Sequence, residues 1–92
     1  MAFLNQQERE ALLNEIKDLR FNQIKGRLFR KDKKCRLAFF RNVQETNRWM
    51  TRYILEGLGT QVTLVESLDR SNGKATYKLE EIIVAPTPEN RL

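Results

Sequence analysis

The 92-residue sequence has no histidine and a single cysteine, Cys35. Histidine is the commonest general base and a common metal ligand near neutral pH, so its absence removes the most frequent catalytic arrangements. One cysteine can form neither an internal disulfide nor a thiolate zinc site, and it is compatible with a reducing compartment. We therefore expect no enzymatic activity, no metal site and no cofactor.

Glycine and long apolar runs are also scarce. None of the four glycines belongs to a Gly-rich connection between a strand and a helix, which argues against a phosphate-binding loop. No apolar run approaches the roughly 20 residues that cross a bilayer. The first residues carry no basic segment followed by an apolar one, so no secretory signal is expected. These absences predict a cytoplasmic protein without a membrane partner.

Positive charge is concentrated in one third of the chain. Residues 20–52 contain eleven Lys or Arg residues against two acidic ones, Asp32 and Glu45, whereas the segments on either side are each slightly acidic. The net charge of +5 and the pI near 9.7 therefore originate in this third. Five aromatic residues lie in the same stretch. Such clustering favours a docking surface for a polyanion.

The N-terminal pattern predicts a helix over residues 6–20. Asn5 and Glu8 have the spacing of a capping pair. An apolar stripe follows at helical spacing and consists of Leu12, Leu13, Ile16 and Leu19.

Residues 23–30 and 34–41 are interpreted as a hairpin with Asp32-Lys33 at its tip. Strand alternation then places Ile24, Gly26, Leu28, Cys35, Leu37 and Phe39 on a core face. The opposite face carries Lys25, Arg27, Phe29, Lys34, Arg36, Ala38 and Phe40. This division depends on register, because a slip of one residue would exchange the two faces of a strand.

Residues 44–56 fit two structures. Val43, Trp49, Met50, Tyr53 and Ile54 share a helical face, and Gly57 is placed to end a helix, so a helix is preferred. The alternative is a strand, because Trp49, Thr51, Tyr53 and Leu55 alternate. Trp49 is interpreted as a core anchor, with stacking on a ligand as the alternative.

A second hairpin is predicted from residues 61–68 and 75–85 around Ser71-Asn72-Gly73, because Asn-Gly favours a type I′ turn. Pairing outward from this turn sets Leu68 against Tyr77, Glu66 against Leu79, Leu64 against Glu81 and Val62 against Ile83. Residues 1–86 form the expected single domain, and residues 87–92 the expected flexible tail.

The predicted fold is an α+β two-layer sandwich in helix-hairpin-helix-hairpin order (αββαββ). It has a four-stranded antiparallel sheet with two helices on one face. The other face of the sheet is then open to solvent.

The favoured function is a small basic module that binds nucleic acid, with single-stranded or structured RNA preferred over DNA. Cations neutralise phosphates, and exposed aromatic rings stack on unpaired bases. The alternative is an adaptor or accessory subunit that docks an acidic protein and can also be a homodimer. The candidate nucleic-acid-binding residues are Lys25, Arg27, Phe29, Arg30, Lys34, Arg36, Phe40, Arg41, Arg48 and Arg52.

Three further residues are weaker candidates for catalysis. Glu66 and Glu81 would lie diagonally across the second hairpin, at a separation compatible with an acid/base pair. Cys35 faces the predicted core and has no histidine to activate it. A structural position is the preferred interpretation of all three.

Overall fold

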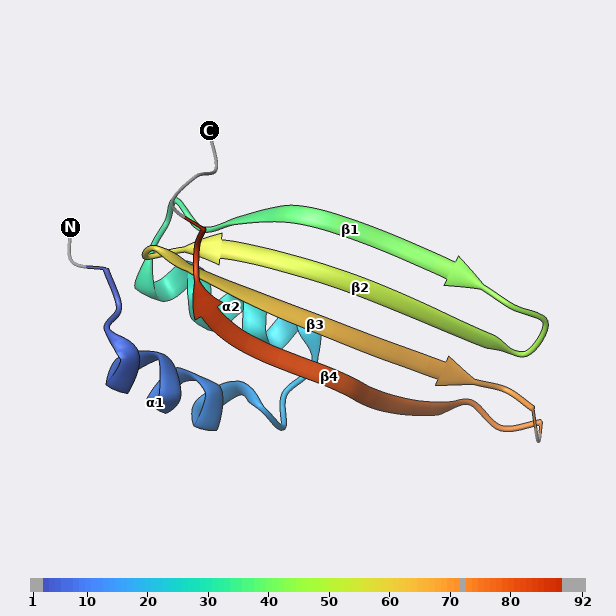
Figure 1. Ribbon diagram of the computed structural model, residues 1–92. Coiled ribbons are helices and arrows are strands. Elements are labelled where there is room, and N and C mark those ends of the chain that lie inside the picture. The colour runs from blue at the N-terminus through green and yellow to red at the C-terminus, as the bar shows by residue number, and fades with distance from the viewer. Residues whose placement is uncertain (1–2, 72, 89–92) are drawn as a thin grey trace.

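The computed structural model describes residues 3–71 and 73–88, and in it two helices precede a four-stranded sheet (Figure 1). The strands form an antiparallel meander in the order β1-β2-β3-β4. The α+β class and the four-stranded antiparallel sheet are confirmed. The predicted αββαββ order is wrong, because both helices come first. The elements are α1 (Gln6–Ile16), α2 (Phe21–Lys31), β1 (Arg36–Gln44), β2 (Arg48–Gly57), β3 (Thr60–Asp69) and β4 (Thr76–Pro86).

The predicted cap of the first helix is confirmed. The Asn5 side chain accepts from the Glu8 backbone N–H at 2.8 Å, and Glu8 accepts from the Asn5 backbone N–H at 3.0 Å. These reciprocal bonds satisfy two donors that a helix start would leave free. The helix ends at Ile16, earlier than the predicted residue 20.

The first predicted strand, residues 23–30, is wrong because this segment lies within α2. Ile24 and Leu28 are buried, and their spacing of four residues places them on one side of a helix. Alternation alone could not exclude this, since two residues four apart also share a face of a strand. Asp32 then ends the helix and accepts from the backbone N–H of Lys34 at 2.9 Å.

The preferred helix over residues 44–56 is also wrong, and the strand alternative is correct. Gly57 pairs with Thr60 across a two-residue turn rather than ending a helix. Both turn residues, Leu58 and Gly59, have positive φ angles of 56° and 67°. This combination is typical of a type I′ hairpin, whose twist matches that of the flanking strands.

The predicted second hairpin is present as β3 and β4, although only part of its register is correct. Leu68 pairs with Tyr77 and Glu66 with Leu79, as predicted. A bulge at the level of Val65 and Glu66 then shifts the register of the remaining pairs by one residue, so that Val65 pairs with Glu81. Leu64 pairs with Ile82 and Val62 with Val84, which corrects the predicted pairings with Glu81 and Ile83. Gly73 has the positive φ of the predicted turn, whereas Asn72 lies outside the described residues.

The apolar core combines both helices with one end of the sheet. Its buried members are Leu12, Ile16, Ile24, Leu28, Cys35, Leu55, Val62 and Leu64. The strand residues among them lie near the β2–β3 turn, and strand alternation places them on the sheet face toward the helices. Cys35 is buried, as its predicted core position requires.

The opposite end of the sheet extends beyond the helices. The chain measures 48 × 28 × 20 Å, and Figure 1 shows both helices near the end where β2 turns into β3. We call this end the proximal half and the end with the β1–β2 and β3–β4 connections the distal half. The predicted tail begins with Thr87, whose backbone N–H donates to the Gly59 carbonyl at 2.9 Å. Residues 89–92 lie outside the described part.

Candidate functional site

The sheet face that points away from the apolar core is the first candidate surface, and we call it the outer face. Its members follow from cross-strand pairing, because directly paired residues share a face. It carries Arg36, Phe39, Arg41 and Val43 of β1, Arg48, Met50, Arg52, Ile54 and Glu56 of β2, Gln61, Thr63, Val65, Ser67 and Asp69 of β3, and Thr76, Lys78, Glu81, Ile83 and Ala85 of β4.

Two arginines stand side by side at the centre of the outer face. Arg41 pairs directly with Arg52, and both are exposed. Like charges in directly opposite positions destabilise a sheet. Neither guanidinium forms an ion pair within residues 3–71 and 73–88. This pair therefore presents two uncompensated positive charges on one small area.

An apolar row lies next to the arginine pair. Phe39 pairs with Ile54, Ile54 with Thr63, and Thr63 with Ile83, so these side chains cross all four strands. Phe39 is 42% exposed and Ile83 46% exposed. The outer face thus alternates a row of apolar groups with a row that carries the two arginines.

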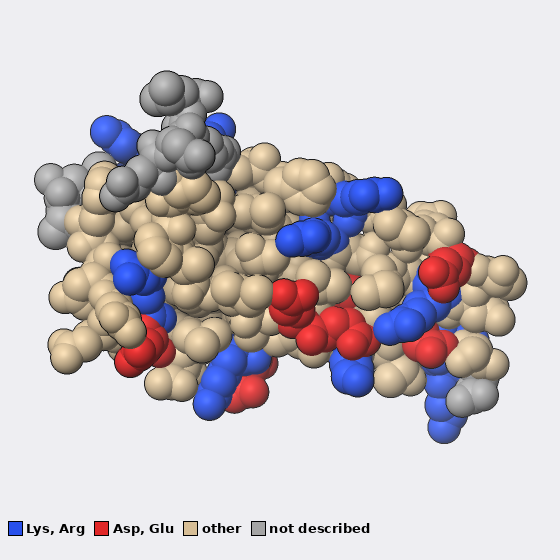
Figure 2. Space-filling model, viewed as in Figure 1, with Lys and Arg blue, Asp and Glu red and all other residues tan. Residues whose placement is uncertain are grey.

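Charge in the middle of the outer face is divided by sign. Figure 2 shows Lys and Arg side chains over β1 and β2 near the middle of the sheet, with Asp and Glu side chains toward β4. At the proximal edge, Arg36 forms an ion pair with the nearly buried Glu56 at 3.2 Å. The free positive charge of this face therefore lies on its β1–β2 side.

The candidate residues from the sequence are separated by the helical structure of residues 21–31. Lys25, Arg27, Phe29 and Arg30 lie on α2, and Lys34 lies in the connection to β1. Of these cations, Arg27 is bound to Glu15 at 3.0 Å. The outer face brings together the other four cations, which are Arg36, Arg41, Arg48 and Arg52.

The predicted pair of stacking rings, Phe29 and Phe40, does not share a sheet face. Phe29 is a helix residue packed against the apolar core, and the Lys25 ammonium lies 5.4 Å from its ring centroid. Phe40 points to the helix side, where its ring centroid is 5.5 Å from that of Tyr53. The bulge between Leu37 and Phe39 places Phe39 on the outer face instead. A strand prediction for residues 48–55 would have placed Arg48 and Arg52 on the same face of the sheet.

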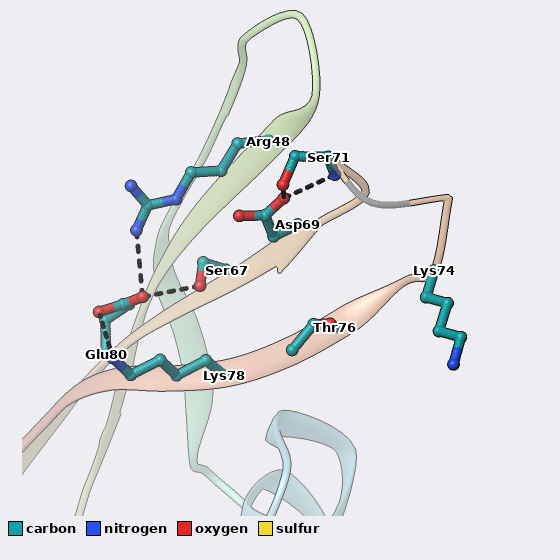
Figure 3. A pocket seen from close by; sticks show the side chains of 8 residues that line it. All are labelled: Arg48, Ser67, Asp69, Ser71, Lys74, Thr76, Lys78 and Glu80. Atoms are coloured by element: carbon teal, nitrogen blue, oxygen red, sulfur yellow. Dashed lines mark hydrogen bonds and ion pairs between the residues drawn. The ribbon is translucent and has the colours of Figure 1, made fainter.

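The distal end of the outer face holds a shallow hollow of about 460 Å³ (Figure 3). Glu80 at its edge accepts from Arg48 at 3.1 Å and from the Ser67 hydroxyl at 2.8 Å. The Ser67 bond is the main reason that the pKa of Glu80 is lowered. Asp69 accepts from the backbone N–H and the hydroxyl of Ser71, which lower its pKa. These carboxylates already have hydrogen-bond partners. The contacts of Glu80 with Arg48 and Ser67, which we call the cross-strand clamp, join β2, β3 and β4.

The opposite, helix-side face of the distal half contains a groove of about 510 Å³, which we call the distal groove. Trp49, Leu68 and Tyr77 form one cross-strand row in it. The Arg20 guanidinium lies 4.2 Å from the Tyr77 ring centroid, and that of Arg70 lies 4.7 Å from the Trp49 ring centroid. Trp49 is 38% exposed and lines this groove, which corrects its interpretation as a core anchor.

Glu66 is a buried carboxylate in the wall of the distal groove. Desolvation raises its pKa, while a bond from the Phe21 backbone N–H, the charge of Arg20 and a bond from Tyr53 oppose the rise. The bulge in β4 places Glu81 on the other face of the sheet, so the considered acid/base pair with Glu66 does not exist. Burial is also the main cause of the raised pKa of the Cys35 thiol.

Comparison with protein-family models, with curated proteins and with solved structures finds no match. Within the described ranges, no group of three or more Cys, Asp or Glu residues is arranged to hold a metal ion. The two helices, each of 11 residues, fall short of the length and apolar character needed to cross a membrane.

Proposed function

We propose that this protein is a non-enzymatic module that binds single-stranded nucleic acid, preferentially RNA, on its outer face. The observation that carries the proposal is the exposed Arg41–Arg52 pair. Two guanidiniums in directly opposite positions repel each other unless an anion lies between them. A phosphate group suits both, because the planar guanidinium donates two parallel hydrogen bonds to phosphate oxygens.

The apolar row beside the arginines supports an unpaired rather than a duplex ligand. Phe39 offers an exposed ring on which one base can stack, and Ile54 and Ile83 continue the flat apolar surface. Stacking on a protein aromatic ring requires a base face that a duplex keeps inside its own stack. The neighbouring phosphates of the strand then lie over the arginine row.

The distribution of charge indicates the path that a bound nucleic-acid strand would follow. Arg36 and Arg48 lie on the same face at the proximal and distal ends of the β1–β2 side. Glu81 on β4 would repel phosphates and keep the nucleic-acid backbone on that side. Lys34 extends the path at the proximal end. The proposed interface is therefore Lys34, Arg36, Phe39, Arg41, Arg48 and Arg52.

A second candidate occupant is another copy of the chain. The central row of the outer face reads Arg41, Arg52, Val65 and Glu81, so its two ends carry opposite charges. Two such rows facing each other about a two-fold axis parallel to the strands would place arginines over Glu81. Docking on an acidic protein would use the same arginines. Either partner would cover the proposed nucleic-acid surface.

The test is a titration of the wild-type protein and of an Arg41→Glu/Arg52→Glu variant with a labelled single-stranded RNA, the same sequence as DNA, and a duplex. The matched control is Arg30→Glu/Lys33→Glu, which makes the same change in net charge away from the outer face. We expect the outer-face variant to lose at least about tenfold in affinity at low salt and the control to lose far less.

Equal losses in both double variants, or no binding at low salt, would contradict the proposal. Light scattering of the free protein identifies the competing occupant. A dimer in wild-type protein that becomes a monomer in the Arg41→Glu/Arg52→Glu variant would assign the outer face to self-association instead.

A further inference from the structure

The distal groove lies on the opposite face of the sheet from the arginine pair. It brings together two aromatic rings, an apolar floor and a buried carboxylate. We propose that this groove binds a single nucleobase that carries an exocyclic amino group. This inference rests on the proposed function, since it names a second contact of the same nucleic-acid strand.

The first argument is the geometry of the aromatic row. Trp49 pairs with Leu68 and Leu68 with Tyr77, so the two rings stand two strands apart on one face. Adjacent strands are about 4.8 Å apart, which separates the two rings by roughly 10 Å at the backbone. A flat ring that lies against both needs about 7 Å, twice the ordinary stacking distance of roughly 3.5 Å. Small rotations of the Trp49 and Tyr77 side chains would bring the two rings to that spacing, with Leu68 beneath the bound base.

The second argument concerns polar groups. Glu66 accepts from the backbone N–H of Phe21 and from Tyr53. An ionised carboxylate has about four lone-pair sites and only accepts hydrogen bonds, so it retains capacity for an amino donor. Cytosine, adenine and guanine carry such an amino group and uracil does not, which gives the groove a basis for selection. The Tyr77 hydroxyl is buried and has no hydrogen-bond partner within the described residues, which is unusual for a buried polar group.

The third argument is the position of two cations. Arg20 lies over the Tyr77 ring and Arg70 over the Trp49 ring, so a guanidinium already contacts one face of each ring. These groups are placed to meet the phosphate of a nucleotide whose base occupies the groove. The distal half is one sheet thick, and Trp49 and Met50 point to opposite faces. A nucleic-acid strand that follows the outer face to Arg48 can therefore pass around the β1–β2 connection, residues 45–47, and reach the groove.

The test uses Trp49, the only tryptophan, as a reporter within the groove. The wild-type protein is titrated at low salt with CMP, AMP, GMP and UMP while tryptophan fluorescence is recorded. We expect saturable quenching by the first three nucleotides and binding at least about fivefold weaker by UMP. Tyr77→Ala should weaken the binding of CMP about tenfold, in keeping with the loss of one stacking partner.

Glu66→Gln retains the shape of the side chain and one acceptor, so it should reduce the preference for CMP over UMP. Equal binding of UMP and CMP to wild-type protein would overturn the role of Glu66. The absence of quenching by all four nucleotides, or quenching that Tyr77→Ala leaves unchanged, would overturn the groove as a base site.

The Arg41→Glu/Arg52→Glu variant separates this inference from the proposed function. If both are correct, this variant loses binding of the RNA strand and still binds CMP in the groove. If the groove alone is wrong, wild-type protein binds RNA and shows no saturable response to any mononucleotide. If the outer face alone is wrong, CMP binds and the double variant binds RNA as wild-type protein does.

Discussion

The proximal and distal halves of one continuous sheet are stabilised by different interactions. The proximal half contributes Leu55, Val62 and Leu64 to the core that the helices complete. The buried residues of β3 in the distal half are polar, Glu66 and Ser67, and each is held by hydrogen bonds. Apolar burial therefore stabilises the proximal half, whereas the buried β3 residues of the distal half depend on hydrogen bonds.

The largest expected effect comes from the same substitution at two positions of β3. Leu64→Ala removes a side chain with no exposed surface and should lower the free energy of unfolding by about 3 kcal/mol. Leu68→Ala, four residues further along on the same face, should cost about 1 kcal/mol because this leucine is only half-buried. Denaturant unfolding of both variants measures the difference. Equal costs would show that the two halves do not differ in packing.

The next effect concerns the cross-strand clamp of the distal half. Glu80→Gln removes the charge that attracts Arg48 and Lys78 while keeping an acceptor for Ser67. Amide hydrogen exchange should become faster at Met50 and Ser67 and remain unchanged at Leu55 and Val62. Uniform acceleration along the whole sheet would mean that the halves unfold as one unit.

A smaller effect is expected from the buried carboxylate. Because burial raises the pKa of Glu66, the folded state binds a proton more tightly than the unfolded state, so this group lowers stability as pH rises from its unfolded pKa through its folded pKa. Glu66→Gln should therefore gain stability relative to wild type on going from about pH 3.5, below the ordinary glutamate pKa of about 4.3, to pH 7. Thermal unfolding of both proteins at both pH values tests this, and a loss of stability of the Glu66→Gln variant relative to wild type between about pH 3.5 and pH 7 would contradict it.

The sequence predicted those parts of the fold that depend on local chemistry. The Asn5–Glu8 cap and the turn signal near Gly73 need no distant partners, and each marked the correct element. The strand prediction for residues 23–30 is wrong because the spacing of Ile24 and Leu28 fits both a helix and a strand. The preference for a helix at Trp49 failed for the same reason, since Trp49 and Tyr53 share a side in either structure.

The candidate site was predictable in composition and not in arrangement. The clustering of Arg36, Arg41, Arg48 and Arg52 was visible in the sequence, because charge needs no register. Their face partners depend on two bulges, near Phe39 and between Val65 and Glu66. A bulge moves every later residue of its strand to the other face. For this reason Phe39 rather than Phe40 lies on the outer face, and Glu81 lies on the face opposite to Glu66.

The most direct test of the central claim is the salt dependence of RNA binding by wild-type protein and by the Arg41→Glu/Arg52→Glu variant. Each phosphate contact to a single strand contributes about 0.7 to the slope of log affinity against log salt. If both arginines hold phosphates, the slope should fall by about 1.4 in the variant and remain unchanged in Arg30→Glu/Lys33→Glu. An unchanged slope in the outer-face variant would show that the nucleic acid binds elsewhere or not at all.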